Sequence, residues 1–250
     1  MVRNDLRREP ARKRRWQPVT GEMPDAAVAM TRRVLHRDDA VMVIDKPAGL
    51  PVHAGPKGGA TLDALLPWLA FGKGRPPGLA HRLDRETSGC LVLGRTKPAL
   101  ARLGELFAKG AVTKTYLALV GDAPGLEDGR IDLPLAKRSE VRGWWMEPSG
   151  EGQAAVTDIR VIARADGVAL VEARPRTGRT HQIRVHLKAL AAPLLGDRIY
   201  GGADTASRLM LHARAIEIPW MAGETIRAQA PLPPDFQAQM RRYGLGTAVS

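Results

Sequence analysis

Short runs of apolar residues, some continuous and some alternating with polar positions, recur along the chain and predict strands. One continuous run at 40–44 ends at Lys46-Pro47, and a second at 90–93 follows a turn rich in Thr, Ser and Gly. Runs of this length bounded by turn residues are typical of buried strands. Alternating positions predict further strands at 113–120, 156–162 and 168–173, the last two paired around the turn Asp166-Gly167.

Leucines spaced three or four residues apart predict helices between these strands. One helix follows Thr61 and runs to Leu69, and a longer one follows Thr96 and stops at Gly110. Threonine is a favourable N-cap, and glycine readily takes the left-handed conformation that ends a helix. A third helix is expected near 183–190, where Ile183, Leu187 and Leu190 share one face.

The two ends of the chain differ in composition from its middle. The first 15 residues hold seven arginines and lysines, two acidic residues and few aliphatic side chains. Such a segment cannot bury a core, so we expect a basic, disordered arm over 1–30, one domain over 31–238 and a tail over 239–250. A targeting sequence is a weaker alternative for the arm, because acidic residues are present in it and serine is absent.

Overall composition limits the class of protein. The chain has 250 residues, 44% of them apolar, and a formal charge of +12 with an isoelectric point near 10.5. Such an excess of Lys and Arg favours a polyanionic partner, with nucleic acid ahead of an anionic membrane surface. No apolar stretch approaches the roughly 18 residues that span a bilayer, and the single cysteine, Cys90, cannot form an internal disulfide. We therefore expect a globular, cytoplasmic protein without a membrane partner.

The segment HRLDRETSG at 81–89 places one carboxylate, Asp84, between Arg82 and Arg85. An acidic residue between two arginines, on a turn that leads into a buried strand, suits a carboxylate held ionised at a sheet edge. Asp84 is therefore the leading candidate for chemistry. A solvated turn aspartate would explain the same spacing, because aspartate is common in turns.

A second candidate site lies at 174–187, where four arginines, a glycine and two threonines lead into the third predicted helix. Helix amides and guanidinium groups both favour negative charge, so this segment can bind an anion. Arg184 is expected near His181, away from the apolar face of the helix. The alternative is a basic face that is merely solvated.

Three aromatic residues each have two interpretations. Tyr116 lies in the alternating run 113–120, where a core position is more common than a catalytic one. Trp144 and Trp145 lie in the segment 121–152, which lacks clear periodicity and is expected to form loops and short strands. The tryptophans can form a corner of the core or a stacking surface for RNA bases, and the core is the more common outcome.

Six segments, in order along the chain, resemble the motifs of the RluA-type pseudouridine synthases. They are DKPAGLPVH at 45–53, HRLDRETSG at 81–89, KTYLALV at 114–120, TGRTHQIRVHL at 177–187, GDRIYG at 196–201 and LMLHA at 209–213. The resemblance covers about residues 33 to 235, which is nearly everything outside the two tails. It implies an α+β catalytic fold built on a mixed, largely antiparallel sheet.

The resemblance also implies a reaction. A uridine is flipped out of its RNA, its glycosidic bond breaks, and the uracil rotates before a carbon–carbon bond replaces the carbon–nitrogen bond. Asp84 corresponds to the catalytic aspartate, Arg184 to the arginine paired with it, and Tyr116 to a tyrosine that lies against the target base. We expect Arg184 to hold Asp84 through two parallel hydrogen bonds, and Arg82 to replace the flipped base.

The expected partner is RNA, and the expected contacts come from basic side chains near these motifs. They are Arg82, Arg85, Lys114, Arg176, Arg179 and His181. Many relatives carry a small RNA-binding domain before the catalytic one, and only the basic arm stands at that position here. The target therefore stays open between ribosomal RNA, transfer RNA or both. We expect a monomer.

No cofactor is implied by the family mechanism, and no metal is expected, because the six histidines include no helical i, i+4 pair. The chain has no GxxxxGK[ST] phosphate loop, no GxSxG elbow and no GxGxxG motif. An aspartyl-phosphate enzyme would need several carboxylates for magnesium, which the arginines beside Asp84 oppose. A non-catalytic RNA-binding or ribosome-assembly protein would explain the charge equally well, but would not require Asp84 and Arg184 to occur together in these motifs.

Overall fold

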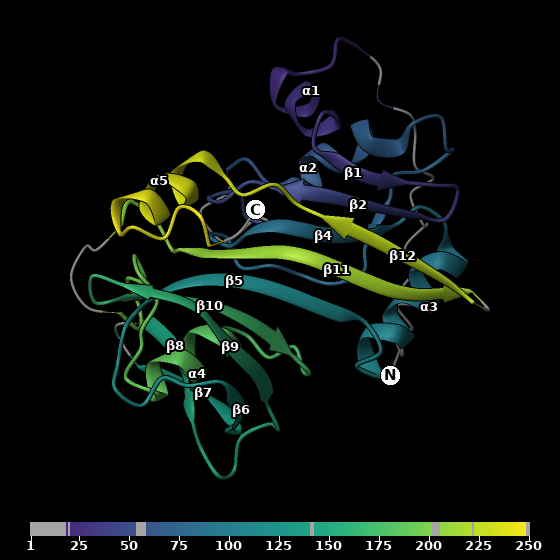
Figure 1. Cartoon of the computed structure of the whole chain (residues 1–250). Coiled ribbons are helices and arrows are strands. Elements are labelled where there is room, and N and C mark those ends of the chain that lie inside the picture. Colours follow the sequence, from purple (N-terminus) through teal and green to yellow (C-terminus); the bar gives the residue numbers. More distant parts are fainter. Residues whose placement is uncertain are drawn as a thin grey trace, which may run out of the picture.

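A computed structural model describes residues 19, 21–53, 59–140, 143–201, 206–221 and 223–248. Within them, one long, twisted sheet of ten strands crosses the molecule (Figure 1). Eight of its strands follow one another in the order β1 (Val34–Arg37), β2 (Val41–Lys46), β4 (Ser88–Gly94), β11 (Leu211–Met221), β5 (Thr113–Gly121), β10 (Val168–Pro175), β9 (Val156–Ala165) and β6 (Gly129–Asp132). In addition, β12 (Glu224–Gln229) pairs with β11 and β3 (Gly78–Leu79) pairs with β4. A separate hairpin consists of β7 (Leu135–Glu140) and β8 (Gly143–Pro148).

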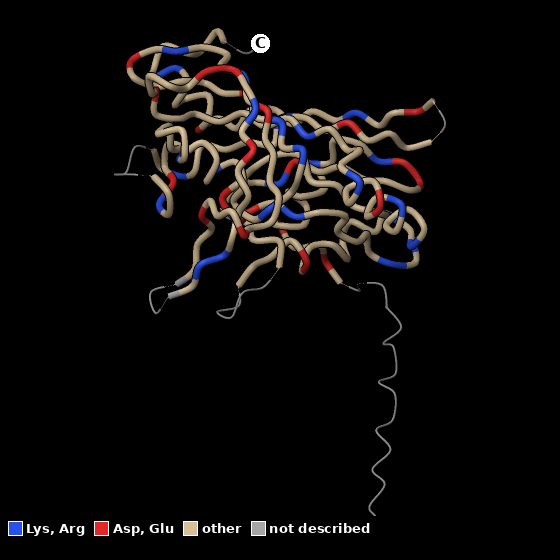
Figure 2. Tube along the Cα trace, turned by 90° about the horizontal axis from the view of Figure 1, so that it is seen from below, with Lys and Arg blue, Asp and Glu red and all other residues tan. Residues whose placement is uncertain are grey.

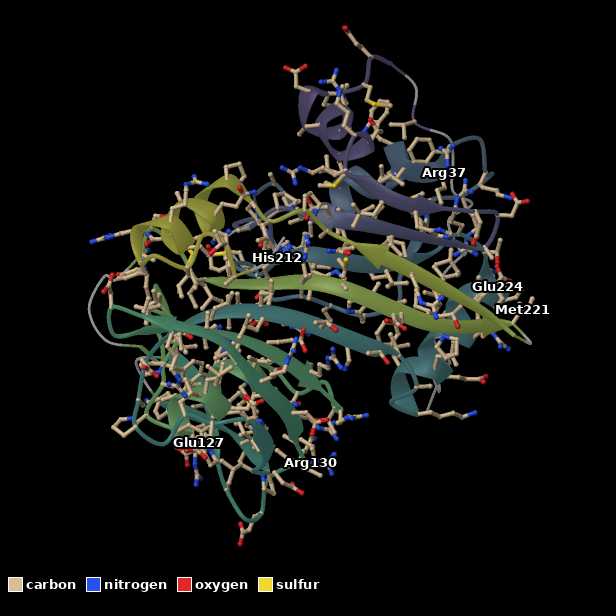
Figure 3. The ribbon with its side chains drawn as sticks, in the orientation of Figure 1. Arg37, Glu127, Arg130, His212, Met221 and Glu224 are labelled. Atoms are coloured by element: carbon tan, nitrogen blue, oxygen red, sulfur yellow. The ribbon has the colours of Figure 1, made fainter. Side chains whose placement is uncertain are left out.

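The pairing between β4 and β11 is the parallel one in this sheet; the other paired strands of the described residues run antiparallel. Ser88 and Gly89 face His212 and Ala213 there. His212 lies near the middle of the sheet (Figure 3), and its Nδ1 is 2.9 Å from the Ser88 hydroxyl. The expected α+β fold with a mixed, largely antiparallel sheet is confirmed.

Every residue of β2 and β4 is buried. Their apolar side chains belong to one cluster that includes Leu62, Leu103 and Ile226 from surrounding elements. A strand covered on both faces has no polar side to alternate with, which explains the continuous apolar runs in the sequence. A second cluster packs around β5, β10 and α4 (Gln182–Ala189), and Tyr116 contacts both clusters where they meet.

Two of the predicted helices begin where expected. The Thr61 and Thr96 hydroxyls accept hydrogen bonds from backbone amides three residues on, and α3 (Lys97–Ala108) ends before Gly110, which has a φ of +66°. The helix after Thr61 is shorter than predicted, because α2 (Leu62–Leu65) gives way to the 3₁₀ turn η1 (Leu66–Ala70). Pro67 explains the change, since proline has no amide hydrogen for an α-helical bond.

The folded domain extends past both expected boundaries. Before residue 31, α1 (Asp25–Thr31) buries Ala27 and Met30. After residue 238, α5 (Pro234–Arg242) buries Met240, and Leu245 packs beside it. The composition of the first 15 residues predicted an arm that reached residue 30, and this prediction missed the short apolar segment of α1. The basic residues of the expected arm lie outside the described residues.

None of the helices in the described part of the chain has the length and hydropathy needed to cross a membrane.

Candidate active site

Asp84 lies in the loop between β3 and β4, and this loop is tied down from behind by the loop that follows β2. The Arg85 carbonyl accepts hydrogen bonds from the Gly49 amide at 2.9 Å and from Lys46 Nζ at 3.0 Å. Lys46 is fully buried and also donates to the carbonyls of Pro47 and Leu50. The DKPAG segment therefore supports the backbone that presents Asp84.

A close backbone approach fixes the other end of the Asp84 loop. Gly89 has a φ of +106°, and a Cβ at this position would collide with the backbone of Ala213 on β11. Only glycine fits such a position without strain. The glycine of the HRLDRETSG segment thus allows β4 to lie directly beside β11.

Arg184, on the first turn of α4, contacts two carboxylates. Its Nε and Nη2 donate to the two oxygens of Asp197, each at 2.7 Å, whereas its Nη1 lies 3.5 Å from Asp84 Oδ2. The expected double hydrogen bond to Asp84 is therefore wrong, although the two residues do meet. The two short hydrogen bonds go to Asp197, which is buried. The side chain of Asp84 is 25% exposed and is therefore less dependent on protein donors.

The Arg184–Asp197 pair is electrostatically balanced. Burial acts to raise the pKa of Asp197, but Arg184 and the amides of Tyr200 and Ile199 lower it further than burial raises it. Asp197 Oδ1 accepts from those two amides at 3.1 and 3.0 Å. Asp197 is thus a fixed anion that orients the guanidinium of Arg184.

His181 lies immediately before α4, with its Nε2 3.8 Å from Asp84 Oδ2. Its other ring nitrogen, Nδ1, is 2.8 Å from the hydroxyl of Tyr200. Burial lowers the pKa of His181, opposed by the charge of Asp84 and assisted by that of Arg184. The ring is therefore expected to be neutral near pH 7.

Tyr116 and Lys114 belong to β5 and line the same cavity as Asp84. Burial raises the pKa of Tyr116, as does the charge of Asp84, so its hydroxyl keeps its proton at neutral pH. Lys114 donates to the Thr177 carbonyl at 3.0 Å, and burial lowers its pKa to about 8. A strand close to the site thus supplies an aromatic ring and a cation.

A cavity of about 470 Å³ lies between these groups. Asp84 and Tyr116 line it together with Arg184, so the three expected catalytic residues are brought together. Cavities of several hundred Å³ hold small organic groups, and one nucleoside is of that size. Among the described residues that line this cavity, Asp84 alone is acidic.

Five of the six expected RNA contacts also line the cavity, namely Arg82, Lys114, Arg176, Arg179 and His181. The sixth, Arg85, lies at a neighbouring hollow of about 300 Å³ and donates to the Gly49 carbonyl. Lys and Arg are spread over the whole fold with acidic residues between them (Figure 2). Charge alone therefore does not locate an RNA surface, and the observation specific to the expected contacts is that five of them line one cavity.

Sequence reasoning missed three residues of the site. Asp197 and Tyr200 belong to the GDRIYG segment, which resembles a family motif, but that resemblance gives neither residue a role. The sequence pattern that could have indicated them is an Asp and a Tyr three positions apart after a turn glycine. Trp144 was expected in the core, but it is 45% exposed and its ring stacks on that of His181. Trp145 is partly buried, as expected, against a small apolar cluster.

No group of three or more His, Cys, Asp or Glu side chains is placed to hold a metal ion in the described part of the chain.

A family model described as RNA pseudouridylate synthase matches residues 40–189. The chain belongs to this family. An uncharacterized RNA pseudouridine synthase of Zymomonas mobilis is 44% identical over 211 residues, covering 83% of this chain and 96% of that protein. Ribosomal large subunit pseudouridine synthase D of Xanthomonas campestris is 41% identical over 228 residues, covering 83% of this chain and 68% of the relative.

The fold agrees with this assignment. The solved structure of human RNA pseudouridylate synthase domain containing 4 superposes with a TM-score of 0.74 at 32% identity, covering 88% of this chain and 95% of that one. The synthase is therefore an isomerase that converts uridine in RNA to pseudouridine, as expected. The comparisons favour this enzyme over the non-catalytic RNA-binding or ribosome-assembly protein.

Proposed function

We propose that Asp84 is the carboxylate with which this synthase attacks, or assists the departure of, the uracil of a flipped uridine. The observation that carries the proposal is its setting as the one acidic group among the described residues that line the cavity. Its side chain is 25% exposed, so a substrate can reach it, while Arg184 and His181 restrict it from one side. A carboxylate so placed can act as nucleophile or base.

Arg184 and Tyr116 have different proposed roles. Arg184 orients Asp84 through its one remaining nitrogen, because Asp197 fixes the plane of the guanidinium. Tyr116 packs its ring against the base and keeps its phenolic proton, since burial raises its pKa. A protonated phenol can donate a hydrogen bond to a carbonyl of the rotating uracil.

The proposed RNA contacts lie at the cationic rim. Arg82 is exposed beside Asp84 and lines the cavity, and in this proposal it occupies the stack that the uridine leaves. Arg176 and Arg179 are exposed as well, although Arg176 pairs with Asp158 and Arg179 donates to the Ala154 carbonyl. Lys114 faces the cavity from the β5 side. These cations would contact phosphates on either side of the flipped nucleotide.

Large-subunit ribosomal RNA is the proposed substrate, with transfer RNA as the alternative. The support is the name of the relatives from Xanthomonas campestris and Zymomonas mobilis, each a ribosomal large subunit pseudouridine synthase D, at 41% and 35% identity. The same relatives support action in the cytoplasm, where bacterial ribosomes are made.

Chemical mapping of pseudouridine in ribosomal and transfer RNA tests both parts of the proposal. Cells that lack the gene should lose pseudouridine at one or a few positions of large-subunit RNA. Expression of the wild-type chain should restore these positions, whereas Asp84→Asn should not, because an amide is neither nucleophile nor base here. Restoration by Asp84→Asn would remove Asp84 from the mechanism, and losses confined to transfer RNA would replace the proposed substrate.

We also propose a monomer that works without metal or cofactor. Asp84, Tyr116 and Arg184 line one cavity within a single chain, so one copy supplies all three proposed catalytic residues. Sedimentation of the active enzyme should give the mass of one chain. Activity on an RNA that stays folded in EDTA should persist, and its loss under that condition would contradict the cofactor-free reaction.

A further inference from the structure

The ring of His181 is restrained on several sides. Its backbone has a φ of +55°, in the left-handed region that residues with a side chain seldom adopt. The ring stacks on Trp144, with centroids 5.2 Å apart and planes 16° apart, and meets the edge of Tyr200. Backbone conformations of this kind cluster at functional sites, where surrounding contacts hold them. The ring therefore has one well-defined direction.

Hydrogen bonding determines which nitrogen of His181 carries the proton. The Tyr200 oxygen accepts a hydrogen bond from the Met146 amide at 2.9 Å and lies 2.8 Å from His181 Nδ1. This oxygen already accepts from an amide, and Nε2 faces a carboxylate oxygen of Asp84 that can only accept, so the phenolic proton is best directed at Nδ1. Nδ1 is then an acceptor, and the proton of the neutral ring lies on Nε2. An outer hydrogen bond of this kind commonly fixes the tautomer of a functional histidine.

The protonated nitrogen faces the carboxylate of Asp84. Nε2 lies 3.8 Å from Oδ2, and Arg184 Nη1 lies 3.5 Å from the same oxygen. Among the described residues, both contacts of the carboxylate fall on Oδ2, and no hydrogen bond or ion pair reaches Oδ1. Catalytic hydrogen bonds are often long in a free enzyme and shorten when substrate binds. Two donors converging on one oxygen would turn the other toward the cavity.

We infer that His181 is a positioning residue: Tyr200 holds it with Nε2–H toward Oδ2 of Asp84, so that Oδ1 is presented to the flipped base. This inference rests on the proposed role of Asp84 and replaces the RNA contact expected for His181. It also gives a role to the β7–β8 hairpin, which supplies both the Trp144 ring and the Met146 amide. The hairpin thus supports Asp84 indirectly: the Trp144 ring packs on His181, and the Met146 amide bonds to Tyr200, which holds His181.

The first test uses Tyr200→Phe, which removes the hydroxyl and keeps the ring beneath the Arg184 guanidinium, 4.9 Å away. Loss of an outer hydrogen bond that orients a functional histidine should lower kcat about tenfold, with KM for the RNA unchanged. Nitrogen NMR of histidine-labelled enzyme gives a readout independent of activity. Wild type should show His181 protonated at Nε2, and Tyr200→Phe should show a mixture of tautomers.

A matched pair at His181 isolates the donor. His181→Gln and His181→Met have similar length and pay the same cost at a positive φ, but only glutamine offers an N–H to Oδ2. Methionine should lower kcat about a hundredfold, and glutamine should recover a large part of that loss. If either variant fails to fold, as judged by urea unfolding, Tyr200→Phe and the NMR measurement decide.

Three results would overturn the inference: an Nδ1–H tautomer in the wild type, equal kcat for the glutamine and methionine variants, or losses in KM alone, which would return His181 to RNA contact. The proposed function fails separately. Normal turnover by Asp84→Asn would remove the catalytic carboxylate itself, whereas an inactive Asp84→Asn with fully active Tyr200→Phe and His181→Met would contradict only the positioning role.

Discussion

Arg184 donates two hydrogen bonds of 2.7 Å to Asp197 and approaches Asp84 only at 3.5 Å. Both members of the shorter pair are buried, with 7% and 2% of their surface exposed. The arginine is therefore held by Asp197 and at the same time approaches Asp84, the carboxylate that we propose for catalysis. Changes at the two carboxylates should consequently have different effects.

Asp197→Asn should lower both stability and turnover. Removing the charge of Asp197 deprives the buried guanidinium of Arg184 of its closer carboxylate, which costs about 3 kcal/mol in the free energy of unfolding. Without its two charged hydrogen bonds to Asp197, Arg184 should also lose its orientation toward Asp84, so kcat should fall. Asp84→Asn, at a partly exposed site, is the control and should abolish turnover with little change in stability. Urea unfolding and single-turnover rates measure the two effects, and an unchanged unfolding curve for Asp197→Asn would contradict the structural role.

Tyr116→Phe should retain folding and RNA affinity and slow the reaction about tenfold, because it removes the hydroxyl that we propose donates a hydrogen bond to the base. Tyr116→Ala should cost more, since it also removes the ring that lies where the two apolar clusters meet. Single-turnover assays at saturating RNA distinguish the two contributions. Full activity of the phenylalanine variant would assign the whole role to the ring.

Stability should fall between pH 6.5 and pH 4 because of His212. Burial lowers its pKa to about 4 in the folded state, against 6.5 for an ordinary histidine. In this window the unfolded chain binds the proton and the folded chain does not, so acid favours unfolding, by about 2 kcal/mol at pH 5 for this one residue. The difference in unfolding free energy between pH 7 and pH 5 should shrink by that amount in His212→Gln. A difference of the same size in both proteins would place the acid sensitivity elsewhere.

The basic amino-terminal segment should contribute RNA affinity that depends on salt. A chain that begins at Met23 keeps α1, whose Ala27 and Met30 are buried, and should fold and modify the same uridine. If the segment makes about three phosphate contacts, its removal should flatten the slope of log affinity against log salt by about two to three. Binding titrations at several salt concentrations measure this slope, and an unchanged slope would show that the segment does not contact RNA.

The sequence was informative wherever one local pattern determined the outcome. Continuous apolar runs predicted the buried strands β2 and β4, and threonine caps located the starts of α2 and α3. Pro67 shortened one helix, and its effect could have been read from the sequence. The six motifs predicted the family. They also singled out Asp84, Tyr116 and Arg184, which line one cavity in the fold.

Side-chain partnerships between distant segments were beyond such patterns. Arg184 could have formed its two parallel hydrogen bonds with either Asp84 or Asp197, and only the fold shows that Asp197 is the buried carboxylate. The exposure of Trp144 follows from the position of the β7–β8 hairpin beside His181, which no periodicity in that segment indicates. The registers of the strands and the order β4-β11-β5 likewise depend on contacts between remote parts of the chain.

The parallel pairing of β4 with β11 bears on when the enzyme can first become active during its synthesis. The loop that carries Asp84 leads into β4, yet Ser88 bonds to His212, 124 residues later in the chain. Although β2 precedes β4 and pairs with it, the ribosome must translate nearly the whole domain before β4 gains its second neighbour, β11. Because a nascent chain folds only as its segments emerge from the ribosome, truncated products should lack an assembled site. Modification of RNA by this synthase would therefore show that translation had passed β11.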